Sequence, residues 1–128
     1  PEPEPVDPNL VSLESVYLPG KYLDVNEDRK CFLSDDSNPL WRRKDVDGHI
    51  ALESLRMPGH LDAGYFDAYV PNKPARGAYR MWDIVPLGDG VVRLASVVHS
   101  GRNLSSGGNK PWTSNENTSV KSVQWRMN

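Results

Sequence analysis

Seven side chains between residues 60 and 112 are of the kinds that hold a polar ligand. Carboxylate and amide oxygens accept hydrogen bonds from hydroxyl groups, and an aromatic ring packs against the apolar face of a sugar ring. Aspartates beside tyrosines, and asparagines beside a tryptophan, therefore make a workable pocket for a sugar or glycan. The candidate ligand-binding residues are His60, Asp62, Tyr65, Asp67, Asn103, Asn109 and Trp112.

The same residues also have structural explanations, which the sequence leaves open. Aspartates often shape turns, so Asp62 and Asp67 fit a loop without any ligand. Phe66 or Tyr69 would fit a hydrophobic core, and Trp112 would fit the edge of a barrel. The sugar pocket and the packed loop are therefore both kept as interpretations.

Acidic and amide residues cluster directly after an apolar segment, at Asp24, Asn26, Glu27 and Asp28. Cation binding needs several oxygens that converge on one point, and the spacing of a calcium loop is absent. We expect a solvated acidic turn here, with no metal site and no cofactor.

The three histidines do not predict an enzyme. His49, His60 and His99 are widely separated, and no serine, cysteine or carboxylate adjoins them in a recognisable catalytic motif. The chain also lacks a phosphate-binding loop and the Cys/His spacing of a metal site. We therefore expect no catalytic residues and a non-enzymatic protein.

The elements that position these residues are organised as a threefold internal repeat of about 40 residues. Residues 11–25 read VSLESVYLPGKYLDV, residues 50–63 read IALESLRMPGHLDA, and residues 92–106 read VRLASVVHSGRNLSS. Each copy has a leucine, a turn glycine, a second leucine and a closing tryptophan. These positions are Leu13, Gly20, Leu23 and Trp41; Leu52, Gly59, Leu61 and Trp82; and Leu94, Gly101, Leu104 and Trp125.

Short alternating apolar segments between turn dipeptides predict four strands in each copy. After the first strand of each copy, we expect second strands at 21–25, 60–63 and 102–105, third strands at 31–34, 67–70 and 111–114, and fourth strands at 40–46, 79–85 and 123–127. Asp47-Gly48 and Asp89-Gly90 predict hairpin turns between copies. Twelve short strands in three repeats fit an all-β, pseudo-threefold β-trefoil: a six-stranded barrel capped by three hairpins. The repeated leucines and tryptophans then form the core, which favours packing over ligand stacking for Trp41, Trp82 and Trp125.

The domain organisation follows from the repeat. Residues 1–10 read PEPEPVDPNL, and their prolines predict an extended arm or linker. Residues 11–128 form one expected β-trefoil domain, with repeats at 11–48, 49–90 and 91–128. The single cysteine, Cys31, lies in an apolar run and is expected to be buried.

Charge and composition exclude some partners. A net charge of −2 and a pI near 5.9 do not favour nucleic-acid binding, which needs a basic surface. No apolar run approaches the length of a membrane span. Sequons at Asn103 and Asn117 permit N-glycosylation, so we expect a secreted, extracellular glycoprotein.

The segment at residues 11–25 resembles the repeat of the arabinose-binding β-trefoil domain of arabinofuranosidases. In that family a similar Ser-Leu-x-Ser-Val-x-x-Pro-Gly-x-Tyr-Leu phrase opens each third, and here Tyr22 matches its aromatic residue. The family's histidine, two residues after the Tyr-Leu pair, is replaced by Val25, Ala63 and Ser106. Gly-Lys-Tyr-Leu also resembles, more distantly, repeats of fascin-type trefoils. The resemblance implies a sugar-binding scaffold without identifying the sugar.

The leading hypothesis is a non-catalytic, lectin-like, carbohydrate-binding β-trefoil whose partner is a sugar or glycan. One alternative is a trefoil that binds a protein partner, such as a protease inhibitor that presents Lys73 and Arg76 in the loop at 71–78. Another is a fascin-like structural or actin-binding module.

Overall fold

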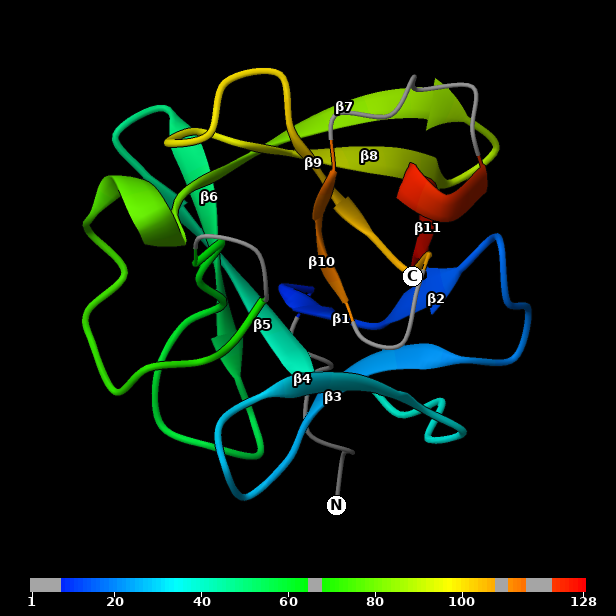
Figure 1. The fold of residues 1–128 in the computed structure, drawn as a ribbon, viewed down its shortest axis with the longest axis horizontal. Coiled ribbons are helices and arrows are strands. Elements are labelled where there is room, and N and C mark those ends of the chain that lie inside the picture. The colour runs from blue at the N-terminus through cyan, green and yellow to red at the C-terminus, as the bar shows by residue number, and fades with distance from the viewer. Residues whose placement is uncertain (1–7, 65–67, 108–110, 115–120) are drawn as a thin grey trace, which may run out of the picture.

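The computed structural model describes residues 8–64, 68–107, 111–114 and 121–128. The described chain is all-β, with an antiparallel sheet of eleven strands and two short 3-10 helices (Figure 1). The strands are β1 (Leu10–Val11), β2 (Leu13–Ser15), β3 (Tyr22–Val25), β4 (Cys31–Ser34), β5 (Trp41–Val46), β6 (His49–Ser54), β7 (Trp82–Gly88), β8 (Val91–Ser96), β9 (Asn103–Ser105), β10 (Trp112–Ser114) and β11 (Trp125–Met127). The helices are η1 (Ala78–Arg80) and η2 (Lys121–Val123).

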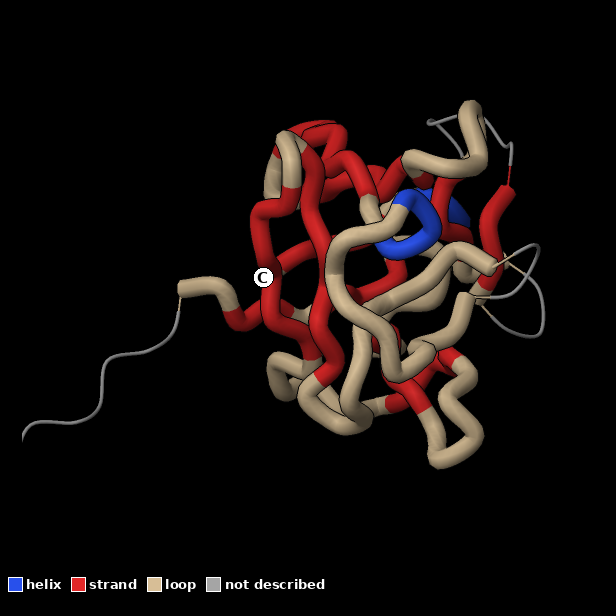
Figure 2. Tube along the Cα trace, turned by 90° about the vertical axis from the view of Figure 1, so that its left-hand side faces the viewer, coloured by secondary structure: helices blue, strands red, loops and turns tan. Residues whose placement is uncertain are grey.

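Six strand positions close into a barrel. The hydrogen-bonded path runs β1-β5-β6-β7-β8-β11-β2, and only Ser12 separates β1 from β2. The path therefore returns to its starting segment. Figure 2 shows the strand-rich barrel on one side of the molecule, with long loops and the short helices on the other. This closed ring is the barrel that the repeat predicted.

Hairpins between the barrel strands form the other layer. β3 pairs with β4, and β9 pairs with β10, as expected for the first and third copies. In the second copy the expected strands at 60–63 and 67–70 are replaced by isolated bridges, which join Glu53 to His60 and Asp62 to Tyr69. Asp67 lies outside the described residues. The described fold is consistent with a β-trefoil whose middle hairpin is irregular.

The irregular hairpin has a cause in the sequence. One residue, His60, separates Gly59 from Leu61, whereas two residues separate Gly20 from Leu23. The shorter segment has less backbone for a regular ladder. Gly59 also packs closely against another segment of the same chain, because a Cβ there would lie 2.0 Å from the carbonyl oxygen of Pro71.

Two of the fourth strands start later than expected. Residues 78–80 and 121–123 form helical turns instead of strand, so β7 begins at Trp82 and β11 at Trp125. The backbone N–H of Met81 donates to the carbonyl of Ala78, and that of Gln124 donates to the carbonyl of Lys121. These local bonds take the place of cross-strand pairing.

The core repeats three times. Trp41, Trp82 and Trp125 are fully buried. The Nε1–H of each indole donates to the carbonyl of the second leucine of its own copy, at 3.0, 3.1 and 3.0 Å. These leucines, and the leucines that open each copy, are also buried. The structural interpretation of the three tryptophans is therefore confirmed.

The turns repeat as well. In each copy a serine two residues after the first leucine accepts a hydrogen bond from a backbone N–H in the following turn, at 3.0 to 3.1 Å. The serines are Ser15, Ser54 and Ser96. Asp47 and Asp89 have positive φ angles of 51° and 54°, as do the glycines after them. This backbone suits the two-residue hairpin turns predicted at both sites.

Cys31 is buried, as expected, and burial raises the pKa of its thiol well above the usual range. The described residues contain no helix long and apolar enough to cross a membrane.

Candidate functional site

The strand register places an acidic or hydroxyl side chain opposite an aromatic residue in all three copies. Asp24 lies opposite Phe32, Asp62 opposite Tyr69, and Ser105 opposite Trp112. Residues directly opposite on antiparallel strands point to the same face, with Cβ atoms roughly 5 Å apart. Asp24, Asp62 and Ser105 each follow the second leucine of their copy. The repeat therefore places one such pair of residues in register in each copy.

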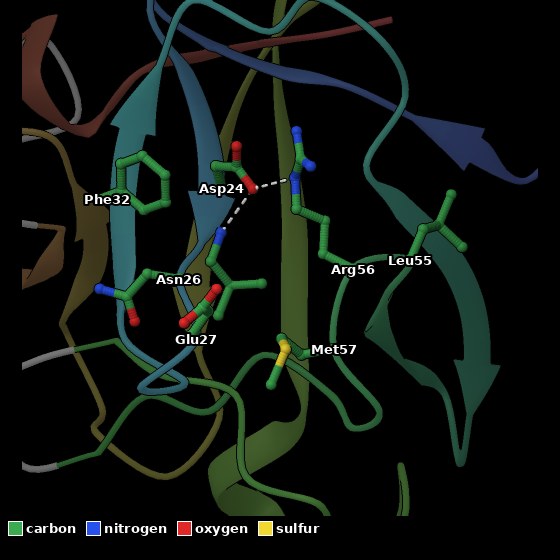
Figure 3. Close-up of a pocket in the computed structure, with 8 residues that line it drawn as sticks. Asp24, Asn26, Glu27, Phe32, Leu55, Arg56 and Met57 are labelled. Atoms are coloured by element: carbon green, nitrogen blue, oxygen red, sulfur yellow. Dashed lines mark hydrogen bonds and ion pairs between the residues drawn. The ribbon is translucent and has the colours of Figure 1, made fainter.

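The first pair opens on a cavity of about 580 Å³, shown in Figure 3. Asp24 is buried, whereas 37% of Phe32 is exposed. In the figure, Asp24 lies between the ring of Phe32 and the guanidinium of Arg56. The cavity is lined by Asp24, Val25, Asn26, Glu27, Phe32, Leu55, Arg56 and Met57.

Arg56 comes from the turn of the second copy and closes the first copy's cavity. Its Nε lies 2.7 Å from Oδ1 of Asp24, and its Nη2 contacts Oδ2 of Asp36. The same Oδ1 of Asp24 accepts a bond from the backbone N–H of Val25 at 2.8 Å. The backbone N–H of Asn38, together with Arg56, lowers the pKa of Asp36. The described contacts of Asp24 thus converge on one of its two oxygens.

The second pair lines a cavity of about 200 Å³. Asp62 is buried, its Oδ1 accepts from the backbone N–H of Gly64 at 2.7 Å, and its Oδ2 lies 3.3 Å from Nη1 of Arg80. Burial and the negative charge of Asp62 raise the pKa of Tyr69. The cavity is lined by Asp62, Gly64, Tyr69, Lys73, Tyr79 and Arg80.

Arg80 also fixes the loop that forms one wall of the second cavity. Its Nε donates to the carbonyl of Pro74 at 2.8 Å, and its Nη2 donates to the carbonyl of Arg76 at 3.3 Å. Arg80 and Arg56 therefore have equivalent roles, although they occupy different positions in the sequence. Each pairs with the buried aspartate of its cavity.

The third copy differs. Ser105 replaces the aspartate, is fully buried, and accepts from the backbone N–H of Gly107 at 3.1 Å. The backbone of Trp112 lies opposite it in β10, while the side chain of Trp112 lies outside the described atoms. The third copy therefore keeps the aromatic position and loses the carboxylate.

Another cavity, of about 300 Å³, lies at the β5–β6–β7 part of the barrel. In it, His49 Nδ1 lies 2.6 Å from Asp83 Oδ1, within hydrogen-bond distance. Its aromatic lining residue, Trp82, is fully buried and presents no ring face for stacking. This cavity is therefore less suited to a sugar.

The structure brings only some of the candidate residues together. Asp62 lines the second cavity, and Trp112 occupies the equivalent aromatic position in the third copy. His60 is buried beside the loop, with Nδ1 2.9 Å from the carbonyl oxygen of Lys73, and does not line the cavity. Tyr65, Asp67, Asn109 and the sequon at Asn117 lie outside the described residues.

Asn103 has a different environment from the one a glycosylation site needs. It is buried in β9, and its Oδ1 accepts a bond from Nη1 of Arg93 at 2.7 Å. A glycan would be attached to Nδ2 of this buried side chain, so Asn103 would have to become exposed to carry one.

Sequence reasoning missed the first cavity. Asp24 was expected in a solvated turn, but the structure corrects this expectation: Asp24 is buried, and only the following Asn26, Glu27 and Asp28 are exposed. Phe32 was not a candidate at all. The available signal was the residue after the second leucine, which is aspartate in two copies.

Comparisons with known proteins agree on the fold. No protein-family model matches the chain, and no curated protein matches its sequence. Among solved structures, a GlcNAcα1-4Gal-releasing endo-β-galactosidase from Clostridium perfringens has a TM-score of 0.80 at 18% identity, over 91% of this chain and 31% of that one. The designed threefold-symmetric protein ThreeFoil has a TM-score of 0.78 at 23% identity, over 91% of this chain and 96% of its own. A Polyporus squamosus lectin, bound to a human-type influenza-binding epitope, has a TM-score of 0.72 at 16% identity, over 96% of this chain and 50% of the lectin.

These similarities show a shared all-β fold, consistent with a β-trefoil. At such sequence identities they do not assign a ligand to this chain. This chain spans about a third of the endo-β-galactosidase with which it aligns.

Proposed function

We propose that this protein binds carbohydrate without cleaving it, and that the pockets built on Asp24/Phe32 and Asp62/Tyr69 hold the sugar. One observation carries the proposal: the same pair of a buried carboxylate and an adjacent aromatic recurs in two copies, and both pairs line cavities. In the first pocket the aromatic ring is 37% exposed beside the buried aspartate, so its face is accessible to a ligand.

The chemistry of the pair suits a sugar. In the first pocket, Arg56 and the N–H of Val25 hold Oδ1 of Asp24, which leaves Oδ2 to accept hydrogen bonds from ring hydroxyls. Phe32 offers a ring for the apolar face of the sugar. In the second pocket, Tyr69 offers the ring, and Asp62 offers a carboxylate whose Oδ1 is held by the N–H of Gly64 and whose Oδ2 is held by Arg80.

The structural neighbours support this proposal without deciding it. The Polyporus squamosus lectin, which shares the fold, is described in complex with a saccharide epitope. The Clostridium perfringens enzyme cleaves a glycan, but this chain corresponds to 31% of that protein, so its activity is not transferred. In both pockets the aspartate is tied to an arginine and a backbone N–H, an arrangement that suits a fixed hydrogen-bond acceptor.

The protease-inhibitor alternative gains less support. An inhibitory loop must offer the carbonyl of its specificity residue to the protease. Here the carbonyls of Lys73 and Arg76 accept hydrogen bonds from His60 and Arg80 of the same chain. The contacts of the loop therefore favour a wall of the second pocket over a loop presented to a protease.

The test is a glycan array with the wild-type protein, followed by calorimetry on each glycan that binds. Asp24→Asn and Asp62→Asn each remove one carboxylate with little change in shape. We expect each variant to lose one class of site, and the double variant to lose binding at least tenfold, since a hydrogen bond to a charged group contributes about 1.5–3 kcal/mol.

Leu87→Ala is the matched control for Phe32→Ala. Both side chains are similarly exposed, at 40% and 37%, but Leu87 lines neither pocket. Phe32→Ala should abolish binding in the first pocket, and Leu87→Ala should leave it intact. Absence of binding across plant, microbial and animal glycans would reject the proposal, as would release of sugar from a bound glycan.

A further inference from the structure

The two pockets share the pair of an aspartate and an aromatic residue, but they differ in the net charge of their lining residues. In each pocket the buried aspartate is paired with an arginine, so these charges largely offset one another. Among the lining residues that the structure describes, the remaining charged one is Glu27 in the first pocket and Lys73 in the second. Both are exposed, and neither makes an ion pair within the described part of the chain. The pockets therefore carry opposite excess charge.

The contacts of Arg80 make Lys73 the available cation of the second pocket. The three nitrogens of Arg80 are engaged by Asp62, Pro74 and Arg76. Its side chain is only 13% exposed. The position of Lys73 is in turn fixed by its backbone, because its carbonyl contacts Nδ1 of His60 and its N–H donates to Pro71. The ammonium group of Lys73 is therefore carried by a segment at the pocket edge whose backbone is fixed by hydrogen bonds.

The first pocket has the opposite balance. Arg56 is shared between Asp24 and Asp36, so one guanidinium faces two carboxylates. Glu27 adds a third negative charge at the lining. An anionic ligand would meet net repulsion there, whereas a neutral ligand would not.

We propose that the second pocket binds a sugar bearing a carboxylate, with Lys73 as the residue that selects it, and that the first pocket binds a neutral sugar. This inference rests on the proposed carbohydrate-binding function and deepens it. The two repeats kept one recognition pair and diverged in the charge beside it. One molecule would then engage a glycan that carries both neutral and acidic units, with avidity from the two sites.

The test uses matched glycosides that differ only at C6, which carries a hydroxymethyl group in the neutral sugar and a carboxylate in the acidic one. Methyl galactoside and methyl galacturonoside form one pair, and methyl glucoside and methyl glucuronoside form another. Two backbone amides report on the pockets separately in NMR titrations: the N–H of Val25, bonded to Asp24, and the N–H of Gly64, bonded to Asp62. We expect the uronoside to shift Gly64 and the neutral glycoside to shift Val25.

Charge variants provide the control. Lys73→Met should weaken uronoside binding at Gly64 by about two- to fivefold, the range for an exposed ion pair, and should leave neutral binding at Val25 unchanged. Added salt should weaken only the uronoside. Glu27→Gln should reduce the discrimination against uronoside at Val25.

The outcomes separate this inference from the function on which it rests. Equal binding of neutral and acidic glycosides at Gly64, or a Lys73→Met variant with unchanged uronoside affinity, overturns the charge selection and leaves carbohydrate binding intact. If no glycoside of either pair shifts Val25 or Gly64 and the glycan array is also silent, both proposals fail. If the array finds a ligand, its neutral and acidic forms replace the glycosides in the same titration.

Discussion

At the scale of single residues, the contacts of Glu53 show why His60 belongs to the framework. Glu53 accepts hydrogen bonds from Arg42 at 3.0 Å and Lys44 at 3.2 Å, and Lys44 Nζ also lies 3.2 Å from His60 Nε2. His60 contacts the carbonyl of Lys73 with its other nitrogen. The His60 ring therefore links β5 to the loop that carries Lys73, and so helps to hold this wall of the second pocket in place.

This network predicts a pH dependence of stability. Partial burial acts to raise the pKa of Glu53, but the hydrogen bonds from Lys44 and Arg42 outweigh it, and the net pKa is lowered. A lowered folded-state pKa stabilises the fold above the unfolded pKa, and this contribution is lost as pH falls through the folded value. Urea unfolding between about pH 7 and pH 3 should therefore show a smaller loss of stability in Glu53→Gln than in the wild type.

Glu27→Gln serves as the control, since Glu27 is exposed and forms no described ion pair. It should follow the wild-type pH dependence. The interpretation of the Glu53 network is wrong if Glu53→Gln and the wild type lose the same free energy on acidification. The side chain of Glu53 is 28% exposed, so we expect a difference below about 1 kcal/mol.

At the scale of elements, the turns show how one repeated sequence unit fits three surroundings. Gly20 and Gly59 occupy the same position of the repeat, and both have positive φ angles, of 85° and 134°. A Cβ on Gly20 would meet nothing within 4 Å, whereas one on Gly59 would meet the backbone of Pro71. The turn of the second copy thus packs against the loop at 71–78. The equivalent loop of the first copy is shorter.

A pair of alanine substitutions tests this difference. Gly20→Ala should cost about 1 kcal/mol, the strain of a left-handed backbone. Gly59→Ala adds a clash with a carbonyl at 2.0 Å, which backbone movement must relieve, and should cost several times more. Thermal unfolding followed by circular dichroism measures both. Equal losses of stability would contradict the close packing of the second turn against Pro71.

At the scale of the whole molecule, the first and last copies close the barrel together. β11 pairs with β2 through Trp125 opposite Ser15, and with β8 through Trp125 opposite Val92. The backbone of Ser12 also exchanges hydrogen bonds with that of Asn128. The barrel is complete only when residues from both ends of the described chain have met, so no single copy holds a closed core.

A chain that stops at Gln124 tests this closure. It lacks β11 and the fully buried Trp125. Removal of a buried tryptophan side chain alone costs about 3–5 kcal/mol, a large share of a typical domain's stability of about 5–15 kcal/mol. We expect no cooperative thermal transition in circular dichroism. The full-length Arg126→Ala variant, which changes an exposed side chain of the same strand, should keep it. A cooperative transition in the shortened chain would show that the barrel folds without its last strand.

The repeat, the barrel and the core could be predicted from the residue pattern alone. Leucine, glycine and tryptophan recur because each copy must bury the same side chains and make the same turn, and that requirement is local enough to be visible in the residue pattern. The Asp-Gly turns and the burial of Cys31 were predicted for the same reason. The irregular middle hairpin was not, because its shape depends on how Gly59 packs against Pro71.

The candidate site depends on contacts that form only in the folded chain. Asp24 needed Arg56 from the next copy to become a buried acceptor, and Phe32 needed the register of β3 and β4 to lie beside it. Asp62 was a candidate from the sequence, yet its arginine lies 18 positions further along, on a helical turn that was expected to be strand. Both pockets are set by distances across the fold, and residues that meet in this way leave no regular spacing in the sequence.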